Sequence, residues 1–207
     1  TMQTFLGACV ELGPADIDED LIAAARITYL EGYLWDPPEA KKAFIKASEV
    51  AHKAGRMVSL SLSDPFCVER HRADFLDLAQ HHVDILFANE EEITSLYQVD
   101  TFDESLQAVR GYCEIAALTR SEKGSVIVSG DEVHEINAES VAQLVDTTGA
   151  GDAYAAGFLH GVTTDRDLRV SGRMGGICAA EVISHLGSRP EASLKALDGE
   201  KFGEKLR

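Results

Sequence analysis

The sequence has few positively charged residues. It contains 19 lysines and arginines against 35 aspartates and glutamates, which gives a formal net charge of −16 at pH 7. Proteins that hold nucleic acid or anionic membrane surfaces do so with lysine and arginine, so this balance argues against both as partners. An acidic chain can still bind a nucleotide, because Mg²⁺ and local backbone dipoles offset the charge of the phosphates.

Cysteine and long apolar runs are scarce as well. The four cysteines are widely spaced and form no C-x-x-C pair, which is typical of reduced core residues and not of a disulfide framework or a metal site: Cys9, Cys67, Cys113 and Cys178. No stretch reaches about 18 apolar residues and no signal-peptide pattern is found, so we predict a cytoplasmic protein without a membrane span. The chain opens on Thr1 without an initiator Met, and we expect it to be a piece of a longer protein.

Apolar and polar segments alternate along the chain in the manner of an α/β protein. We predict strands at residues 4–10, 27–32, 57–62, 83–88, 114–119 and 140–145. We predict helices at residues 16–25, 37–54, 75–79, 90–93, 103–112, 153–159 and 167–185, the second capped by Asp36 and the fourth by Asn89. Strand–helix alternation at this spacing favours a mostly parallel sheet with right-handed crossovers, and 207 residues fit one such domain.

A hairpin interrupts this alternation. Residues 124–128 and 132–136 flank Ser129-Gly130-Asp131, so antiparallel strands are expected to join one edge of the sheet. Ligands of parallel sheets bind at the carboxyl ends of the strands. Asn89, Thr119 and Asp146 all stand at the ends of predicted strands.

The stretch Asp146-Thr147-Thr148-Gly149-Ala150-Gly151-Asp152 lies between a predicted strand and a predicted helix. The free N–H groups and the dipole of a helix start favour an anion there. Asp152 stands at the same place, which suits a base that takes a proton while a phosphoryl group arrives. A dinucleotide fingerprint would need a third glycine where the chain has Tyr154, and no Gly-Lys-Ser/Thr of a P-loop follows.

This stretch is identified as the signature of the ribokinase-like, or PfkB, family of small-molecule kinases, which reads Asp/Asn-Thr-x-Gly-Ala-Gly-Asp. Every position matches. The resemblance implies a three-layer αβα sandwich with a mostly parallel central sheet and antiparallel edge strands. It implies that Asp152 is the base that activates the substrate hydroxyl, and that the N–H groups of Gly149, Ala150 and Gly151 stabilise the transferred phosphoryl group. ATP and Mg²⁺ are the implied cosubstrate and metal.

Two further segments resemble elements of that family. Asn89 and Glu92 are similar to its Asn-x-x-Glu element, which helps to organise Mg²⁺ and its waters near the nucleotide phosphates. An ordinary helix cap with acids in the first turn is the alternative. The segment from Thr119 to Gly124 is similar to the family's Thr-x-Gly-x-x-Gly nucleotide loop, with Ser121 in place of the middle glycine. Thr119 and Gly124 are therefore expected at the nucleotide, and a polar turn before a strand is the alternative.

A monovalent cation site is implied next to the signature. Asp146 and Thr148, with the turn at Gly187, resemble the place where many family members hold such an ion, K⁺ for example. In many sugar kinases of the family an Asn upstream of that turn lies near the adenine. Gly176 occupies that position here, so no adenine contact is carried over.

The expected acceptor follows from another resemblance. Residues 60–66 and 83–90 resemble the Leu-Ser-Ala-Pro-Phe and Asp-Ile-Leu-Phe-x-Asn-Glu segments of adenosine kinases, and residues 29–33 also resemble that branch. Generic apolar strands are the alternative. The resemblance implies a kinase that phosphorylates the primary hydroxyl of a small nucleoside, adenosine to AMP, a step of purine salvage. A ribokinase-like sugar kinase acting on ribose, fructose or a similar sugar is the alternative.

Residues 1–207 resemble one α/β domain that forms the C-terminal major portion of a PfkB kinase, without the N-terminal part that supplies much of the substrate pocket and the lid. We therefore expect this piece alone to have a nucleotide site and weak or no kinase activity. A homodimer is one assembly that the full-length protein could form. Two other classes are a nucleotide-binding relative without turnover, which the intact Asp152 disfavours, and an NAD-binding oxidoreductase domain, which the missing third glycine disfavours.

Overall fold

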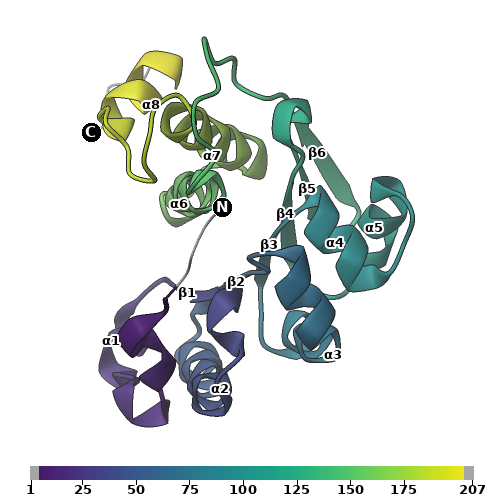
Figure 1. Ribbon diagram of the computed structural model, residues 1–207, viewed down its shortest axis with the longest axis vertical. Coiled ribbons are helices and arrows are strands. Elements are labelled where there is room, and N and C mark those ends of the chain that lie inside the picture. The colour runs from purple at the N-terminus through teal and green to yellow at the C-terminus, as the bar shows by residue number, and fades with distance from the viewer. Residues whose placement is uncertain (1–4, 203–207) are drawn as a thin grey trace. The chain divides into compact units, whose positions relative to one another are not determined.

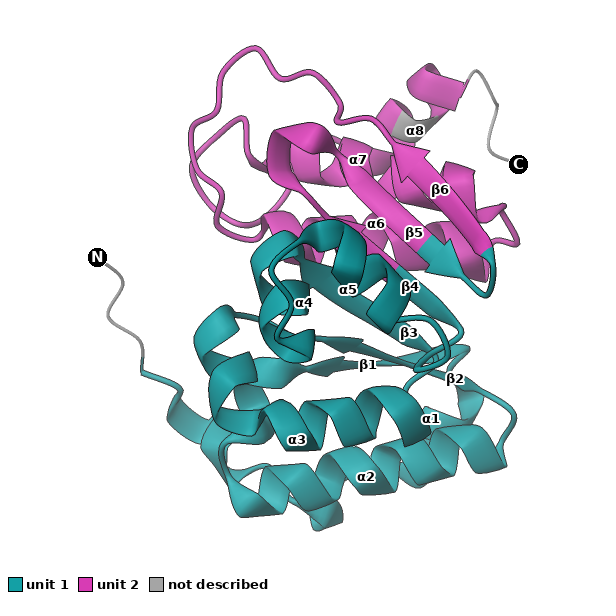
Figure 2. Cartoon of the chain, turned by 90° about the vertical axis from the view of Figure 1, so that its right-hand side faces the viewer, with its two compact units in different colours: residues 1–116, 128–131 teal, residues 117–127, 132–207 magenta. Residues whose placement is uncertain are grey.

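The structure, a computed structural model, describes residues 5–202. The chain divides into two compact units (Figure 2): a first unit of residues 1–116 and 128–131, and a second unit of residues 117–127 and 132–207. The strands are β1 (Ile27–Glu31), β2 (Met57–Ser61), β3 (Ile85–Asn89), β4 (Ile115–Thr119), β5 (Ser125–Ser129) and β6 (Glu132–Ile136). The helices are α1 (Glu19–Ala24), α2 (Pro38–Lys53), α3 (Pro65–His81), α4 (Glu90–Tyr97), α5 (Phe102–Ala108), α6 (Ala150–Thr163), α7 (Leu168–Val182) and α8 (Leu194–Phe202).

The strands follow one another in the sheet in chain order, from β1 to β6. β1 and β2 are parallel, with Ile27 opposite Met57, and β2 and β3 are parallel, with Ser59 opposite Ile85. A short turn joins β5 to β6 through Gly130, whose φ of 56° lies in the left-handed region. These observations confirm the predicted α/β class and the predicted hairpin.

Helix α2 (Figure 1) belongs to the first unit, and its sequence pattern explains which of its faces is buried. Its apolar residues recur every three to four positions and therefore share one face. That face is buried as predicted, except that Val50 is only half-buried: Ala40, Ala43, Phe44, Ala47 and Ala51. Gly55, at φ 67°, follows the end of the helix.

The predicted cap of this helix is wrong. Pro37 is the N-cap residue of α2, and no side chain caps the helix. The Asp36 carboxylate instead accepts hydrogen bonds from Arg70 and His71, whose Nε2 lies 2.5 Å away. Both partners belong to α3, which is far longer than the predicted helix at 75–79, begins at Pro65 behind its cap Asp64, and is kinked at His71. A partner 35 residues away in the sequence cannot be read from local capping rules.

In the second unit, glycines allow α6 and α7 to pack closely. A Cβ at Gly161 would lie 2.5 Å from the Ser171 Oγ, and one at Gly157 would lie 2.6 Å from the Met174 carbonyl oxygen. The Tyr154 hydroxyl of α6 donates to the Ser125 Oγ of β5 at 2.8 Å. These contacts fix α6, which carries the end of the predicted signature, to α7 and β5 of the second unit.

Two predicted strands are wrong. Residues 7–11 form a 3-10 turn, and residue 4 of that prediction lies outside the described residues. Residues 140–145 form no strand, and Leu144 and Val145 are 60% and 41% exposed. The Val145 N–H donates to the Ile183 carbonyl at 2.9 Å and not to a neighbouring strand. Helix α6 therefore follows a loop. No helix was predicted where the structure has α8.

All four cysteines are free thiols. Cys67 and Cys178 are buried as predicted, but Cys113 is only half-buried and Cys9 is exposed, so the predicted core placement is wrong for Cys9. Within residues 5–202, no helix is both long enough and apolar enough to cross a membrane.

Candidate functional site

The start of α6 presents open backbone N–H groups. Gly149 is its N-cap residue, at φ 81°, and no side chain caps the helix. The Ala150 N–H donates to the Thr147 carbonyl at 3.1 Å, and the Ala153 N–H makes the first α-helical bond, to the Gly149 carbonyl at 2.9 Å. Among the described residues, no acceptor faces the N–H of Gly151 or of Asp152. Of the three amides predicted to hold the phosphoryl group, the one at Ala150 is thus already engaged.

Asp152 is the third residue of α6 and is exposed. Its carboxylate makes no hydrogen bond or ion pair within the part of the chain that the structure describes. Tyr154 and Ala155, two and three residues further along the helix, are buried, whereas Asp152 itself is exposed to solvent. A carboxylate placed in this way is free to take a proton from a bound alcohol.

The two glycines of the signature are required for different reasons. Gly149 has a positive φ, and a Cβ there would lie 2.6 Å from the Cβ of Ser188. Gly151 has ordinary helical geometry, and a Cβ there would meet nothing within 4 Å. Packing therefore requires a glycine at Gly149 but not at Gly151. The lack of a side chain at Gly151 must have a reason other than packing.

Asp146 joins the residues predicted to hold a monovalent cation. Its carboxylate accepts hydrogen bonds from the Thr148 N–H at 3.0 Å, the Thr148 hydroxyl at 2.7 Å and the Gly187 N–H at 3.3 Å. The Thr148 amide, then its hydroxyl and the Gly187 amide, lower the pKa of Asp146 below its usual range. Sequence reasoning missed Ile183, whose carbonyl also accepts from the Asp146 N–H at 3.4 Å. Nothing in the local pattern marks that carbonyl.

The predicted nucleotide loop keeps a tight form at the end of β4. Thr119 is the last residue of the strand, the Arg120 N–H donates to the Gly124 carbonyl at 2.7 Å, and the Gly124 N–H donates to the Ser121 carbonyl at 3.0 Å. Gly124 has φ 84°, and a Cβ there would overlap the Ile136 carbonyl oxygen. Ser121 has φ 51°, which explains why a glycine suits the equivalent position of the family pattern.

Asn89 and Glu92 form a closed capping box at the start of α4, in the first unit. The Glu92 N–H donates to the Asn89 Oδ1 at 2.9 Å, and the Glu92 carboxylate accepts from the Asn89 N–H at 2.9 Å and from its side-chain amide at 2.7 Å. Glu92 is 5% exposed, and this burial raises its pKa to about 7. The hydrogen bond from the Asn89 N–H lowers the pKa, and the nearby carboxylates of Asp64 and Glu31 raise it by smaller amounts.

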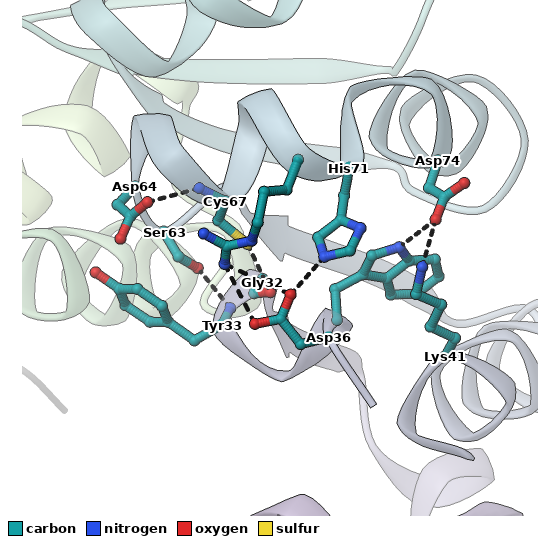
Figure 3. Close-up of polar contacts among 11 residues, drawn as sticks. Gly32, Tyr33, Asp36, Lys41, Ser63, Asp64, Cys67, His71 and Asp74 are labelled. Carbon is teal, nitrogen blue, oxygen red and sulfur yellow. Dashed lines mark hydrogen bonds and ion pairs between the residues drawn. The ribbon is translucent and has the colours of Figure 1, made fainter. Parts of the chain in front are cut away.

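A polar cluster at the carboxyl ends of β1 and β2 was not predicted as a site (Figure 3). Ser63 has φ 73°, its hydroxyl oxygen accepts from the Tyr33 N–H at 3.2 Å, and its hydroxyl donates to the Glu31 carboxylate. Two aromatic residues of the same chain segments reach solvent, Tyr33 at 45% and Phe66 at 72% exposure. The resemblance of residues 29–33 and 60–66 to adenosine kinases was the signal that pointed here.

Metal ligation by side chains alone does not fit the described residues. Among them, no three His, Cys, Asp or Glu are grouped so that they could hold a metal ion. Both oxygens of Glu92 already accept hydrogen bonds from Asn89. An Mg²⁺ ion near Glu92 therefore fits only with water and phosphate oxygens as its main ligands, which is the coordination that Mg²⁺ prefers.

Comparison with known proteins decides the family. Residues 3–194 match the model described as pfkB family carbohydrate kinase. The chain belongs to this family. The fold is accordingly ribokinase-like, as the signature implied.

Its relatives in the PfkB family carry two kinds of name. Adenosine kinase of Saccharomyces cerevisiae is 29% identical over 202 residues, which cover 90% of this chain and 58% of the yeast protein. A crystal structure of a probable sugar kinase protein from Rhizobium etli CFN 42 has a TM-score of 0.93 at 50% identity, over 96% of this chain and 60% of that one. The crystal structure of adenosine kinase from Sinorhizobium meliloti has a TM-score of 0.92 at 47% identity, over 97% of this chain and 61% of that one. The chain thus spans about three fifths of the length of the proteins it matches.

Proposed function

We propose that the protein is an ATP-dependent kinase that phosphorylates the primary hydroxyl of a small nucleoside, most simply adenosine to AMP. The observation that carries this proposal is the start of α6, where open amides stand beside the unpaired carboxylate of Asp152. Membership of a kinase family supports the same chemistry.

In the proposed reaction Asp152 takes the proton of the acceptor hydroxyl as the acceptor oxygen attacks the γ-phosphorus of ATP. The bond between the γ-phosphorus and the oxygen that bridges it to the β-phosphate breaks, and ADP leaves. The Gly151 and Asp152 amides, with the dipole of α6, stabilise the negative charge on the transferred group. The bare surface at Gly151 suits this role, because a side chain there would hold the phosphate away from the amides.

The remaining predicted residues have supporting roles in this proposal. The loop from Thr119 to Gly124 and the start of α4 at Asn89 bind the nucleotide. Mg²⁺, when bound, offsets phosphate charge, and Glu92 orients its waters. Asp146 and Thr148, with Gly187, bind a monovalent cation such as K⁺, and their contacts through one carboxylate support a shared site.

A nucleoside acceptor is favoured over a sugar by the exposed rings of Phe66 and Tyr33. Aromatic rings can stack on a purine base, whereas a sugar offers no comparable flat face. Two relatives with adenosine kinase names support this choice. The Rhizobium etli protein, described as a probable sugar kinase, keeps a sugar acceptor as the second candidate.

We also propose that the full-length protein is cytoplasmic, with a homodimer as one assembly open to it. Residues 1–207 carry a nucleotide site, and full turnover needs the remaining two fifths of a typical relative. The observation behind this need for a further part is the partial coverage of the relatives.

A coupled assay of ADP release tests the function. The full-length protein is given ATP and Mg²⁺ with adenosine, ribose, fructose or no acceptor. We expect turnover with adenosine far above the other three, and phosphate on the 5′ oxygen by ³¹P NMR. ADP release that is equal with and without acceptors would refute the kinase assignment, and higher turnover with ribose or fructose would replace the nucleoside by a sugar.

A further inference from the structure

The short 3-10 helix Gly32–Trp35 follows β1 and is bound, together with the next residue, Asp36, along one face of α3 (Figure 3). The α3 residues that make these contacts recur every three to four positions, so they share one face of the helix: Cys67, Arg70, His71 and Asp74. Contacts that repeat along a helix face fix the attached segment in both position and orientation.

Asp36 carries the charge at the centre of these contacts. Its carboxylate lies 2.5 Å from the His71 Nε2 and 3.2 Å from the Arg70 guanidinium. The hydrogen bond from His71, and then the one from Arg70, hold the pKa of Asp36 below its usual range against the effect of burial, so the carboxylate is charged. The Asp36 and Arg70 side chains are about half exposed, and an ion pair so open to water adds little to the stability of the fold. The role of these contacts therefore lies in what they position.

Two further contacts tie the segment to α3 on either side of Asp36. The Cys67 thiol donates to the Gly32 carbonyl at 3.2 Å, and the Trp35 Nε1–H donates to the Asp74 carboxylate at 2.8 Å. A Cβ on Gly32 would lie 2.7 Å from the nearest backbone carbonyl oxygen at the end of β2, so the segment is also packed closely there. Asp36 binds α3 between these two points.

The segment carries one of the two rings on which a nucleoside base is proposed to stack. Tyr33 lies within it, and its N–H donates to the Ser63 Oγ at 3.2 Å. After burial, the Asp64 carboxylate is the largest cause of the raised pKa of the Tyr33 hydroxyl, about 12, so the two groups lie close together. Asp64 is the cap of α3, and Phe66 stands in the first turn of that helix. The spacing of the two rings therefore depends on how the segment is held against α3.

We propose that Asp36 is a positioning residue for the nucleoside: through Arg70 and His71 it fixes Tyr33 relative to Phe66 and so sets the affinity for the base. This inference rests on the proposed kinase function and adds residues that act through the two rings. Stacking is confined to ring-centroid separations of about 4.5–7 Å, so it needs rings at a fixed spacing. Rings that are already in place bind more tightly, because binding does not have to order them.

Binding to the full-length protein gives the first test. Calorimetry measures the affinities of the parent and of Asp36→Ala for adenosine and for ADP, with folding confirmed by circular dichroism. We expect Asp36→Ala to bind adenosine roughly 10-fold more weakly, the low end of the effect of a lost hydrogen bond to a charged group, and to bind ADP as the parent does. The KM for adenosine should rise in step and kcat should be nearly unchanged, because only binding is altered. Unaltered adenosine affinity in Asp36→Ala would overturn the inference.

Two control variants separate positioning from stability. Asp77→Ala removes another aspartate that binds a histidine of α3, since Asp77 lies 3.1 Å from His81 in an exposed pair. Thr101→Ala removes the cap of α5 and should destabilise the fold more than Asp36→Ala does. Both controls should bind adenosine as the parent does. A loss in either control as large as that in Asp36→Ala would overturn the inference, because a general loosening of the fold would then explain it.

Two variants of His71 give the second test. His71→Gln keeps an N–H group near the place of the Nε2 atom that binds Asp36, whereas His71→Leu keeps none. We expect His71→Gln to retain most of the adenosine affinity and His71→Leu to lose it. The double variant Asp36→Ala/His71→Leu should be no worse than either single variant, because both remove the same contact. Equal losses in His71→Gln and His71→Leu, or additive losses in the double variant, would refute the role of this contact.

The two proposals fail in different ways. Adenosine turnover with unchanged adenosine affinity in Asp36→Ala would leave the kinase standing and remove Asp36 from positioning. Adenosine binding that weakens in Asp36→Ala, in a protein that phosphorylates no acceptor, would do the reverse. Turnover with ribose or fructose and none with adenosine would refute both, because no base would then stack on the rings.

Discussion

Two helix starts in this protein carry an acid at the same position and use it in opposite ways. Glu92 is the third residue of α4, and its carboxylate turns back to accept the N–H of the cap residue Asn89. Asp152 is the third residue of α6, and its carboxylate bonds to nothing among residues 5–202. At α4 the polar groups satisfy one another, whereas at α6 the amides and the acid are left open.

The difference shows what the fold needs and what it leaves for a ligand. A closed capping box stabilises a helix by itself. An uncapped start forgoes that stabilisation and leaves its amides open to water or to a ligand. The same acid at the same helical position is therefore a structural group at α4 and a candidate reacting group at α6.

The largest effect is expected at the open helix start. Asp152→Asn should lower kcat for adenosine phosphorylation by roughly 10²- to 10⁴-fold, because a general base is lost, and leave ADP affinity nearly unchanged. The coupled ADP assay and calorimetry measure the two quantities. Asp103→Asn, which alters an exposed acid in the first turn of α5, is the matched control and should retain full activity. An Asp152→Asn protein as fast as its parent would show that the open acid is not a base.

Substitution by alanine should change the free energy of unfolding in opposite directions at the two signature glycines. Gly149→Ala should lower the free energy of unfolding by about 2–3 kcal/mol, because the new Cβ meets Ser188 and the residue has a positive φ. Gly151→Ala should raise that free energy by about 0.5–1 kcal/mol through helix propensity, yet reduce turnover. Urea unfolding and the coupled assay measure both. Destabilisation by Gly151→Ala would mean that the fold, and not a ligand, requires that glycine.

The closed helix start should respond to pH. Burial raises the pKa of Glu92 from 4.5 to about 7, so ionisation of this carboxyl opposes folding. The stability that the protonated carboxyl contributes to the folded state is fully present below pH 4.5 and is lost as the pH rises through 7. Relative to the parent, Glu92→Gln should therefore gain about 2 kcal/mol in unfolding free energy between pH 5 and pH 8. Urea unfolding at both values measures this gain, and Glu91→Gln, exposed on the same turn, should show none. A pH-independent difference would place the pKa of Glu92 near its usual value.

The smallest effect concerns the cap itself. Asn89→Ala should lower the unfolding free energy by about 1 kcal/mol, because the Glu92 N–H loses its acceptor. Thr101→Ala removes the corresponding cap of α5, remote from the predicted site residues in sequence, and should cost a similar amount. Only Asn89→Ala should also weaken nucleotide binding. Equal nucleotide affinity in both variants would confine Asn89 to the capping role.

Local rules predicted some helix starts and the hairpin, but they failed for α3, for α8 and for contacts between distant parts of the chain. The Asn89 cap, the hairpin at Gly130 and the start of α6 close to Asp152 follow from short-range chemistry, and the structure contains all three. Asp36 was misassigned because its partners Arg70 and His71 arrive from another helix. The residues at 140–145 resemble a strand in composition, but β-structure needs a neighbouring strand, and the Val145 amide finds a helix-end carbonyl instead.

The same limit applies to the site. The signature located Asp152 and its glycines, but it could not show that the Ala150 amide is engaged or that Gly149 is packed against Ser188. The amides that bind the Glu181 Oε1 come from a loop ten residues further along the chain, so no local motif could reveal this contact.

Ser121 offers a practical route to a more stable protein. Its backbone occupies a conformation that side chains resist, and replacement by the glycine of the family pattern would relax the loop without moving Thr119 or Gly124. Directed-evolution libraries that aim at heat tolerance should therefore include this codon first. A gain there would come from relief of local strain and would leave the chemistry of α6 untouched.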